Sequence, residues 1–130
     1  MIKSAKKLTR DLAASVFFTL LILILMSNLF EIQNIRGNSM APTLKNGYKI
    51  LLLKHITTIN QGDIVVFREA YTNNYFIKRV VTLNNANIYV EGDNSVESLD
   101  SRHFGSITKN QILGKVLVVL WPPKKLAKPH

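Results

Sequence analysis

Ser39 stands in a short polar segment whose neighbours favour a rigid loop. The segment reads Gly37-Asn38-Ser39-Met40-Ala41-Pro42-Thr43-Leu44. Gly37 and Asn38 suit a tight turn before the serine, and Pro42 restricts the backbone after it. Met40 either packs against apolar surface and fixes the orientation of Ser39, or touches a bilayer. The segment predicts a loop that presents one hydroxyl, which nucleophilic catalysis requires, although an ordinary turn serine has the same local sequence.

Lys78 is the best candidate for the base that such a serine needs. It lies in the run Tyr-Phe-Ile-Lys-Arg-Val-Val, whose composition favours a strand. Because strand side chains alternate between faces, Lys78 shares a face with Phe76 and Val80, and Arg79 points to the other face. Burial among apolar groups lowers the pKa of a lysine from about 10.4 and favours the neutral amine, which accepts a proton. The alternative is a lysine whose stem runs along a strand edge to reach water.

A polar segment at residues 92–105 supplies further candidates. Asp100 and Arg102 are close enough in sequence to form an ion pair that stiffens this segment. His103 is the one serious rival to Lys78 as a base. The alternative is a solvated surface loop. A calcium site is not indicated, because the oxygen ligands do not follow the spacing of a calcium-binding loop, and we expect neither a metal nor a cofactor.

Residues 12–30 form the long apolar run of the chain and carry no charge. A helix needs about 20 apolar residues to cross a bilayer, so the run is long enough for a membrane anchor. The basic residues Lys3, Lys6, Lys7 and Arg10 precede it, which by the positive-inside rule places the N-terminus in the cytoplasm. A cleaved secretory signal peptide is the alternative. The length of the run and the lack of an Ala-x-Ala sequence after it argue against cleavage.

The chain has 130 residues, a net charge of +9 and no cysteine. This length accommodates one domain, and the lack of cysteine excludes disulfides and thiolate metal sites. The basic residues crowd the two ends of the chain, which fits anionic lipid headgroups. The sequence shows no basic helix and no basic–aromatic array of the kind that binds nucleic acid. We therefore expect a lipid bilayer as a partner and no nucleic acid.

After the apolar run, short β-branched and aromatic segments alternate with turn residues, which predicts strands. The expected strands cover residues 48–53, 63–68, 74–83, 88–91 and 111–121, and residues 92–109 are expected to form an irregular loop. The predicted fold class is mostly β, with one N-terminal transmembrane helix followed by a small antiparallel β domain. The expected organisation is a cytoplasmic basic N-terminus at 1–11, an anchor at 12–30, an extracytoplasmic catalytic domain at 31–121 and a basic tail at 122–130.

The end of the last expected strand has two interpretations. Residues 118–121 are apolar and include Trp121, and Lys124 and Lys125 follow closely. Tryptophan and lysine both favour the membrane interface. The same apolar residues also suit an ordinary core, and the sequence leaves both interpretations open.

Four segments in this order resemble the type I signal peptidases, which are membrane-bound proteases with a serine and a lysine in the active site. The segments are the serine loop at 37–44, Gly62-Asp63-Ile64-Val65-Val66-Phe67, Lys78-Arg79-Val80, and the polar segment with Gly92-Asp93-Asn94 and Ser98-Leu99-Asp100-Ser101-Arg102. The resemblance covers nearly the whole chain. It departs at residues 82–87, which replace the family's Gly-x-Pro-Gly-Asp turn and leave no room for the accessory β domain of larger relatives.

The resemblance implies a role for each candidate residue. Ser39 is the nucleophile, and neutral Lys78 is the general base. Ser98 hydrogen-bonds the Lys78 amine and orients it, while Asp100 and Arg102 brace the site. The backbone N–H of Ser39 is one oxyanion donor. Some relatives supply a second donor from a hydroxyl two residues earlier, a position that is glycine here.

The same resemblance implies a substrate and a place of action. An extended signal peptide of an exported preprotein adds to a sheet edge and is cut after small residues at an Ala-x-Ala-like site. The expected location is the plasma membrane, with a single pass and the β domain outside the cytoplasm. Two alternatives stay open, a protease dedicated to one exported precursor and a catalytically silent relative that binds signal peptides. A basic membrane-surface or nucleic-acid-binding protein is a third, and it explains only the charge.

Overall fold

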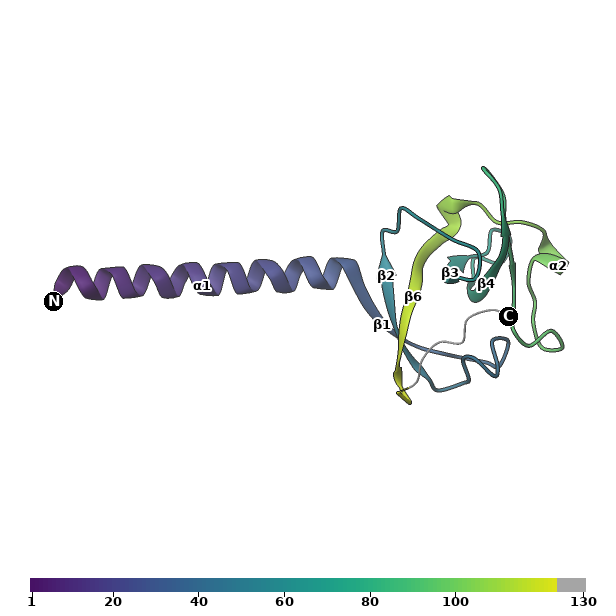
Figure 1. Ribbon diagram of the computed structural model, residues 1–130, viewed down its shortest axis with the longest axis horizontal. Coiled ribbons are helices and arrows are strands. Elements are labelled where there is room, and N and C mark those ends of the chain that lie inside the picture. Colours follow the sequence, from purple (N-terminus) through teal and green to yellow (C-terminus); the bar gives the residue numbers. More distant parts are fainter. Residues whose placement is uncertain (124–130) are drawn as a thin grey trace. The chain divides into compact units, whose positions relative to one another are not determined.

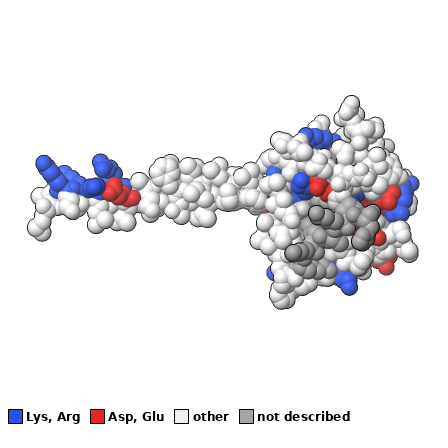
Figure 2. All heavy atoms as spheres, viewed as in Figure 1, with Lys and Arg blue, Asp and Glu red and all other residues white. Residues whose placement is uncertain are grey.

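The computed structural model describes residues 1–123 and divides the chain into two compact units, Met1–Phe30 and Glu31–His130 (Figure 1). The first unit is helix α1 (Ile2–Leu29), which has no buried residue and is long and apolar enough to cross a membrane. Its charged side chains gather over the first turns, and uncharged residues follow to its end (Figure 2). The helix therefore includes most of the predicted basic segment as well as the predicted anchor.

Two hydroxyl groups in the apolar part of α1 hydrogen-bond within the helix. Thr19 Oγ1 donates to the Ser15 carbonyl at 2.8 Å, and Ser27 Oγ donates to the Ile24 carbonyl at 2.8 Å. An unpaired hydroxyl is costly in hydrocarbon. Because both hydroxyls are paired, they are compatible with a lipid environment.

The second unit is built on one six-stranded sheet. Its strands are β1 (Phe30–Asn34), β2 (Lys49–Lys54), β3 (Ile64–Arg68), β4 (Tyr75–Leu83), β5 (Ile88–Glu91) and β6 (Ile112–Trp121), in the order β1-β2-β6-β3-β4-β5. The pairs from β2 to β5 in this order are antiparallel. The predicted fold class, an apolar N-terminal helix followed by a small antiparallel β domain, is confirmed.

The elements differ from the expected ones in two places. Strand β1 is not foreseen, because its residues directly continue the apolar run and are too few to show an alternation of their own. The segment 92–109 is not wholly irregular. It contains the short helix α2 (Ser101–Phe104) and a bridge from Ile88 to Ile107, and the turn η1 (Lys109–Gln111) closes it. A four-residue helix has too little sequence to show helical periodicity.

The core lies on both faces of strand β3. Ile64 and Val66 belong to one apolar cluster, and Val65 and Phe67 belong to the other. All four side chains are buried, which strand alternation allows only if both faces of β3 are covered. Val65 is the register partner of Lys78 in the neighbouring strand β4. The lysine is therefore carried by a strand that pairs with the most buried strand of the sheet.

The end of β6 contains both buried and exposed apolar residues. Val116 and Val119 are buried in the core, whereas Leu120 and Trp121 are exposed, Trp121 by 63%. The core interpretation is confirmed for Val119, and the exposed residues 118, 120 and 121 leave the membrane-interface interpretation a prediction. The predicted basic tail lies outside the described residues from Lys124 onward.

We predict that Gly114→Ala destabilises the β domain. Gly114 lies in β6 between β2 and β3, and a Cβ there would lie 2.6 Å from the Leu53 carbonyl oxygen and 2.8 Å from Leu52 Cγ. Overpacking of this kind costs about 1–3 kcal/mol, so the melting temperature in detergent should fall by several degrees. Leu113→Ala, at the exposed neighbouring position, is the control. Equal melting temperatures for the two variants would contradict the packing seen around Gly114.

Candidate active site

The loop that carries Ser39 is anchored in the core on its far side. Met40 and Leu44 are fully buried in the same apolar cluster as Ile64. The loop is closed by backbone hydrogen bonds from Leu44 N–H to the Met40 carbonyl (2.9 Å) and from Ala41 N–H to the Asn38 carbonyl (3.0 Å). Of the two roles considered for Met40, the structure shows packing into the core, which fixes the position of the adjacent Ser39.

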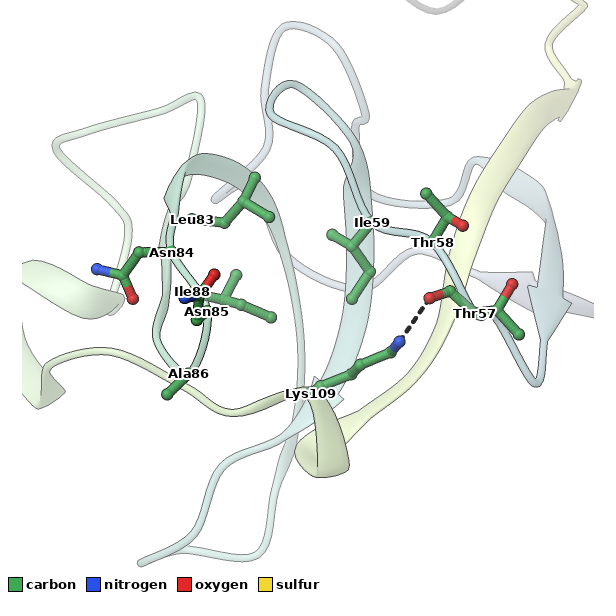
Figure 3. Close-up of a pocket in the computed structure, with 9 residues that line it drawn as sticks. All are labelled: Thr57, Thr58, Ile59, Leu83, Asn84, Asn85, Ala86, Ile88 and Lys109. Carbon is green, nitrogen blue, oxygen red and sulfur yellow. Dashed lines mark hydrogen bonds between the residues drawn. The ribbon is translucent and has the colours of Figure 1, made fainter.

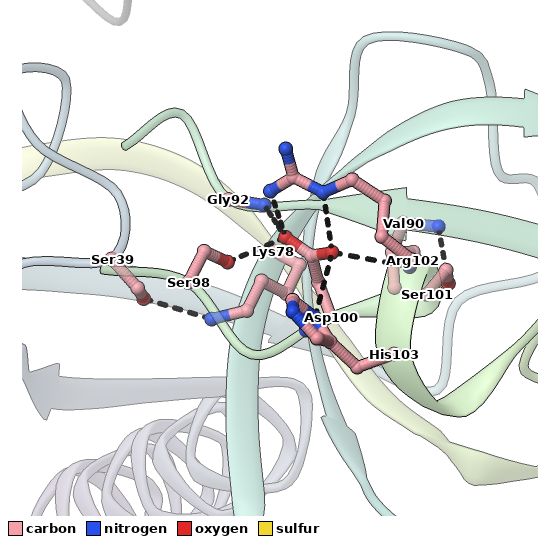
Figure 4. Close-up of polar contacts among 9 residues, drawn as sticks. All are labelled: Ser39, Lys78, Val90, Gly92, Ser98, Asp100, Ser101, Arg102 and His103. Carbon is pink, nitrogen blue, oxygen red and sulfur yellow. Dashed lines mark hydrogen bonds and ion pairs between the residues drawn. The ribbon is translucent and has the colours of Figure 1, made fainter. Parts of the chain in front are cut away.

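Lys78 brings its amine to the Ser39 hydroxyl. Its Nζ donates a hydrogen bond to Ser39 Oγ at 2.8 Å, as Figure 4 shows. The side chain is 2% exposed, and Nζ lies 5.4 Å from the centre of the Phe76 ring. The shared face of Lys78 and Phe76 is thus as strand alternation predicts, and the lysine does not reach water along a strand edge.

Burial lowers the pKa of Lys78 from 10.5 to about 8, and the negative charge of Asp100 opposes this change. The direction follows from the cost of placing an ammonium ion among apolar groups. At neutral pH about one molecule in ten then carries a neutral Lys78 amine. A neutral amine in hydrogen-bond contact with a hydroxyl is able to take its proton.

Asp100 is the centre of a polar network beside the lysine. Arg102 donates to both of its carboxylate oxygens, from Nε at 2.9 Å and from the terminal nitrogen at 2.6 Å. Ser98 Oγ and the Gly92 N–H also donate to it, at 2.6 and 2.9 Å. Burial alone would raise the pKa of Asp100, but the hydrogen bonds from Arg102, Ser98 and Gly92 outweigh it and hold this pKa below its ordinary value. The carboxylate is fully buried, charged and paired with Arg102, so the expected ion pair is present.

Ser98 has a different partner from the one that the resemblance implies. None of the hydrogen bonds among residues 1–123 joins Ser98 to Lys78, since the Ser98 hydroxyl donates to Asp100. Figure 4 nevertheless shows Ser98 on the same side of Asp100 as the tip of Lys78.

His103 is engaged at the start of α2. Its Nδ1 accepts the backbone N–H of Asp100 at 3.3 Å, which completes the cap of the helix. The imidazole is 52% exposed, and Figure 4 shows it beside Asp100 rather than beside Ser39. The structure therefore gives the Ser39 hydroxyl a lysine partner and no histidine partner among the described residues.

A second ion pair, absent from the expected site residues, ties the serine loop to the sheet. Arg79 donates to both carboxylate oxygens of Asp93, at 2.8 and 2.7 Å. The Thr43 hydroxyl, from the serine loop, donates to the same carboxylate. Burial opposes ionisation of Asp93, but the hydrogen bonds from Arg79 and Thr43 lower its pKa overall. The sequence does contain a signal for this ion pair. Arg79 lies on the strand face opposite Lys78, and a half-buried arginine there requires an acidic partner.

The backbone of residues 92–94 packs closely on the serine. Asn94 N–H donates to the Ser39 carbonyl at 2.9 Å, and Asn94 Nδ2 donates to the Asn38 carbonyl at 3.2 Å. A Cβ at Gly92 would lie 2.5 Å from the Ser39 carbonyl oxygen and 2.1 Å from Ser98 Oγ. Only glycine permits this approach, which brings the serine loop and the polar segment together.

A groove of about 380 Å³ lies between the chain segments that precede Ser39 and Lys78. One wall is the end of β1 with the residues after it, and the other is the beginning of β4. Its lining residues are Gln33, Asn34, Ile35, Arg36, Val66, Asn74, Tyr75, Phe76 and Ile77. Neither Ser39 nor Lys78 is among the lining residues, but Arg36 lies three residues before Ser39 and Ile77 immediately precedes Lys78.

A smaller pocket of about 210 Å³ lies at the other end of β4 (Figure 3). It is lined by Thr57, Thr58, Ile59, Leu83, Asn84, Asn85, Ala86, Ile88 and Lys109. Its one charged lining residue, Lys109, points to the Thr57 carbonyl and donates a hydrogen bond to it. The lining contains no nucleophile paired with a base, so this pocket has no part in the candidate chemistry. Within residues 1–123, no cluster of three or more acidic or histidine side chains is placed to hold a metal ion.

Comparison with known proteins assigns the chain to a family. The family described as signal peptidase, peptidase S26, matches residues 8–88 and 82–121, and the chain belongs to it. Over 152 aligned residues it is 28% identical to mitochondrial inner membrane protease subunit 2 of Saccharomyces cerevisiae, which covers 94% of this chain and 85% of that protein. It is 30% identical over 118 residues to mitochondrial inner membrane protease subunit 1 of Schizosaccharomyces pombe, an alignment that covers 72% of this chain and 75% of that protein. It is 28% identical over 155 residues to signal peptidase I of Bacillus caldolyticus, and this alignment covers 76% of this chain and 85% of that protein. The resemblance to type I signal peptidases is confirmed.

We predict that Asp93→Asn loosens the serine loop and destabilises the domain. The change removes the charge that Arg79 and Thr43 bind, and hydrogen bonds to a charged group contribute about 1.5–3 kcal/mol each. The free energy of unfolding should therefore fall by about 2 kcal/mol in urea titrations in detergent. Glu97→Gln, which neutralises an exposed carboxylate nearby, is the matched control. If both variants unfold at the same urea concentration, Asp93 does not hold the loop.

Proposed function

We propose that this protein is a membrane-bound serine endopeptidase that removes signal peptides from exported preproteins, with Ser39 as nucleophile and Lys78 as general base. The observation that carries the proposal is the 2.8 Å contact between the Ser39 hydroxyl and the buried Lys78 amine. Family membership supports a protease acting on signal peptides. The contact supplies the specific chemistry, because it pairs a weak nucleophile with a base of lowered pKa.

The proposed reaction begins with the neutral form of Lys78. The Lys78 amine takes the proton of the Ser39 hydroxyl while Oγ attacks the scissile carbonyl and forms a tetrahedral intermediate. The resulting ammonium gives its proton to the departing amine, and the peptide bond breaks to leave an acyl-enzyme. A water molecule, deprotonated by Lys78, then releases the acyl group and restores Ser39.

The backbone N–H of Ser39 is the proposed oxyanion donor. It makes no hydrogen bond with any residue in the described part of the chain, so it is available to the developing oxyanion. Asp100 favours the ammonium form of Lys78 through its charge. That charge stabilises the protonated lysine of the intermediate. Ser98 and Arg102 hold the carboxylate in place, which makes them positioning residues.

The groove between the segments that precede Ser39 and Lys78 is the proposed binding site for the residues before the cut. Strand β5 pairs with β4 from Arg79 to Leu83, so the beginning of β4 is open to an added strand on that side in the described structure. Ile35 and Ile77 belong to or pack against the apolar cluster and form the floor. An extended peptide alternates its side chains, so the first and third residues before the cut face this floor. A shallow apolar floor favours small side chains there, as in an Ala-x-Ala site.

The proposed location follows from α1 and from the charge around it. Residues 12–30 form the anchor, the basic residues 1–11 stay in the cytoplasm, and the catalytic domain at 31–121 lies outside, in the plasma membrane. The relatives include both signal peptidase I and mitochondrial inner membrane protease subunits. This second group supports the alternative in which the protein is a processing protease dedicated to one exported precursor.

We predict that cleavage of a preprotein with an Ala-x-Ala site, in detergent micelles, depends on both residues of the pair. Ser39→Ala and Lys78→Ala should each lower kcat by about 10³-fold or more, whereas Lys49→Ala, at an exposed lysine on β2, should not change it. For the wild type, kcat/KM should rise about tenfold per pH unit up to about 8 and then level off, because protonated Lys78 cannot accept the proton.

The outcomes separate the alternatives. Cleavage of a single exported precursor among several would indicate a dedicated protease. Binding of signal peptides without cleavage at any pH would contradict the proposal and indicate a silent relative. Full activity of Lys78→Ala would exclude Lys78 as the base.

A further inference from the structure

The groove carries a positive charge that no described residue neutralises. Arg36 lines it, its side chain is exposed, and it forms no ion pair or hydrogen bond with any residue in the range 1–123. Other arginines of the domain are engaged, since Arg79 binds Asp93 and Arg102 binds Asp100. The Arg36 guanidinium is thus available to a ligand in the groove.

The burial of Ile35 between two exposed neighbours places Arg36, two residues after the end of β1, beside one position of a bound peptide. Ile35 is buried in the floor of the groove, and its two neighbours, Asn34 and Arg36, are exposed. Because Asn34 and Arg36 are exposed on either side of the buried Ile35, they lie on the outward side of this wall. The second residue before the cut also faces outward, since the first and third face the floor. Its side chain therefore projects on the same side as Arg36.

The composition of the groove favours a negative partner at that position. None of its nine lining residues is acidic, and the amides of Asn34 and Asn74 offer further hydrogen-bond donors, whereas the Gln33 amide already donates to Glu31 at 2.9 Å. A carboxylate accepts hydrogen bonds from guanidinium and amide groups alike. A peptide with lysine at the second position before the cut would be repelled by Arg36. No carboxylate among the described lining residues would offset this repulsion.

We propose that Arg36 is a specificity-determining residue that favours preproteins with aspartate or glutamate at the second position before the cut. The inference rests on the proposed function and adds a substrate preference to it. Arg36 acts on substrate binding and has no part in the transfer of protons at Ser39.

The test compares three peptides that carry Ala-Asp-Ala, Ala-Ala-Ala or Ala-Lys-Ala before the cut. With the full chain in detergent micelles at low salt, kcat/KM should fall in that order. The range should be roughly tenfold, as expected for one attractive and one repulsive exposed pair, with the change mainly in KM. Because exposed charges are screened by salt, the range should shrink at high ionic strength.

Two charge reversals make the test specific. Arg36→Glu should invert the order of the three peptides. Lys49→Glu makes the same change in net charge on β2, outside the lining of the groove, and should leave the order unchanged. Equal kcat/KM values for the three peptides with the wild type, or the same inverted order of kcat/KM in both variants, would overturn the inference.

A binding measurement separates this inference from the proposed function. The Kd of each fluorescent peptide for Ser39→Ala should follow the same order, whether or not the wild type cuts. Cleavage of all three peptides at equal rates would refute the preference alone. A failure to cut any peptide would refute the proposed function, and the order of the Kd values would still decide the role of Arg36.

Discussion

The burial of one lysine amine beside one serine hydroxyl is the constraint on which this structure depends. A charged ammonium in an apolar environment is costly, and the amine of Lys78 is almost fully buried. Asp100, the negative charge that acts on this amine, already accepts hydrogen bonds from Arg102, Ser98 and Gly92. Asp100 therefore moderates the cost without removing it, which is why burial remains the larger influence on the pKa of Lys78.

Strand β4 uses neighbouring residues for two different purposes. Lys78 faces the serine hydroxyl, whereas Arg79 points to the other face and binds Asp93, which also accepts from Thr43 of the serine loop. The first contact is the proposed chemistry, and the second fixes the loop that presents the nucleophile. Because both contacts come from one strand, a change in the register of β4 would break them together.

Much of this arrangement could be predicted from the sequence, because local patterns determine it. The alternation around Lys78 gives both the strand and the face of the lysine, and the turn residues around Ser39 give the loop. Strand β1 and helix α2 could not be predicted, since each is short and is defined by tertiary partners rather than by periodicity. The link from Thr43 to Asp93 depends on the approach of two segments 50 residues apart, which no local pattern encodes. The partner of Ser98 is Asp100, only two residues away, so there a local contact takes the place of the contact with Lys78 that the resemblance implies.

The most direct test of the account is the titration of Lys78 itself in the folded protein. The chemical shift of its side-chain Cε, measured by NMR on the chain labelled with ¹³C-lysine in detergent micelles and assigned with Lys78→Arg, reports the charge of the amine as the pH rises. The account predicts a midpoint near pH 8, well below the midpoints of the exposed lysines. A midpoint near the ordinary lysine value of about 10.4 would show a charged amine at working pH and would contradict Lys78 as the base.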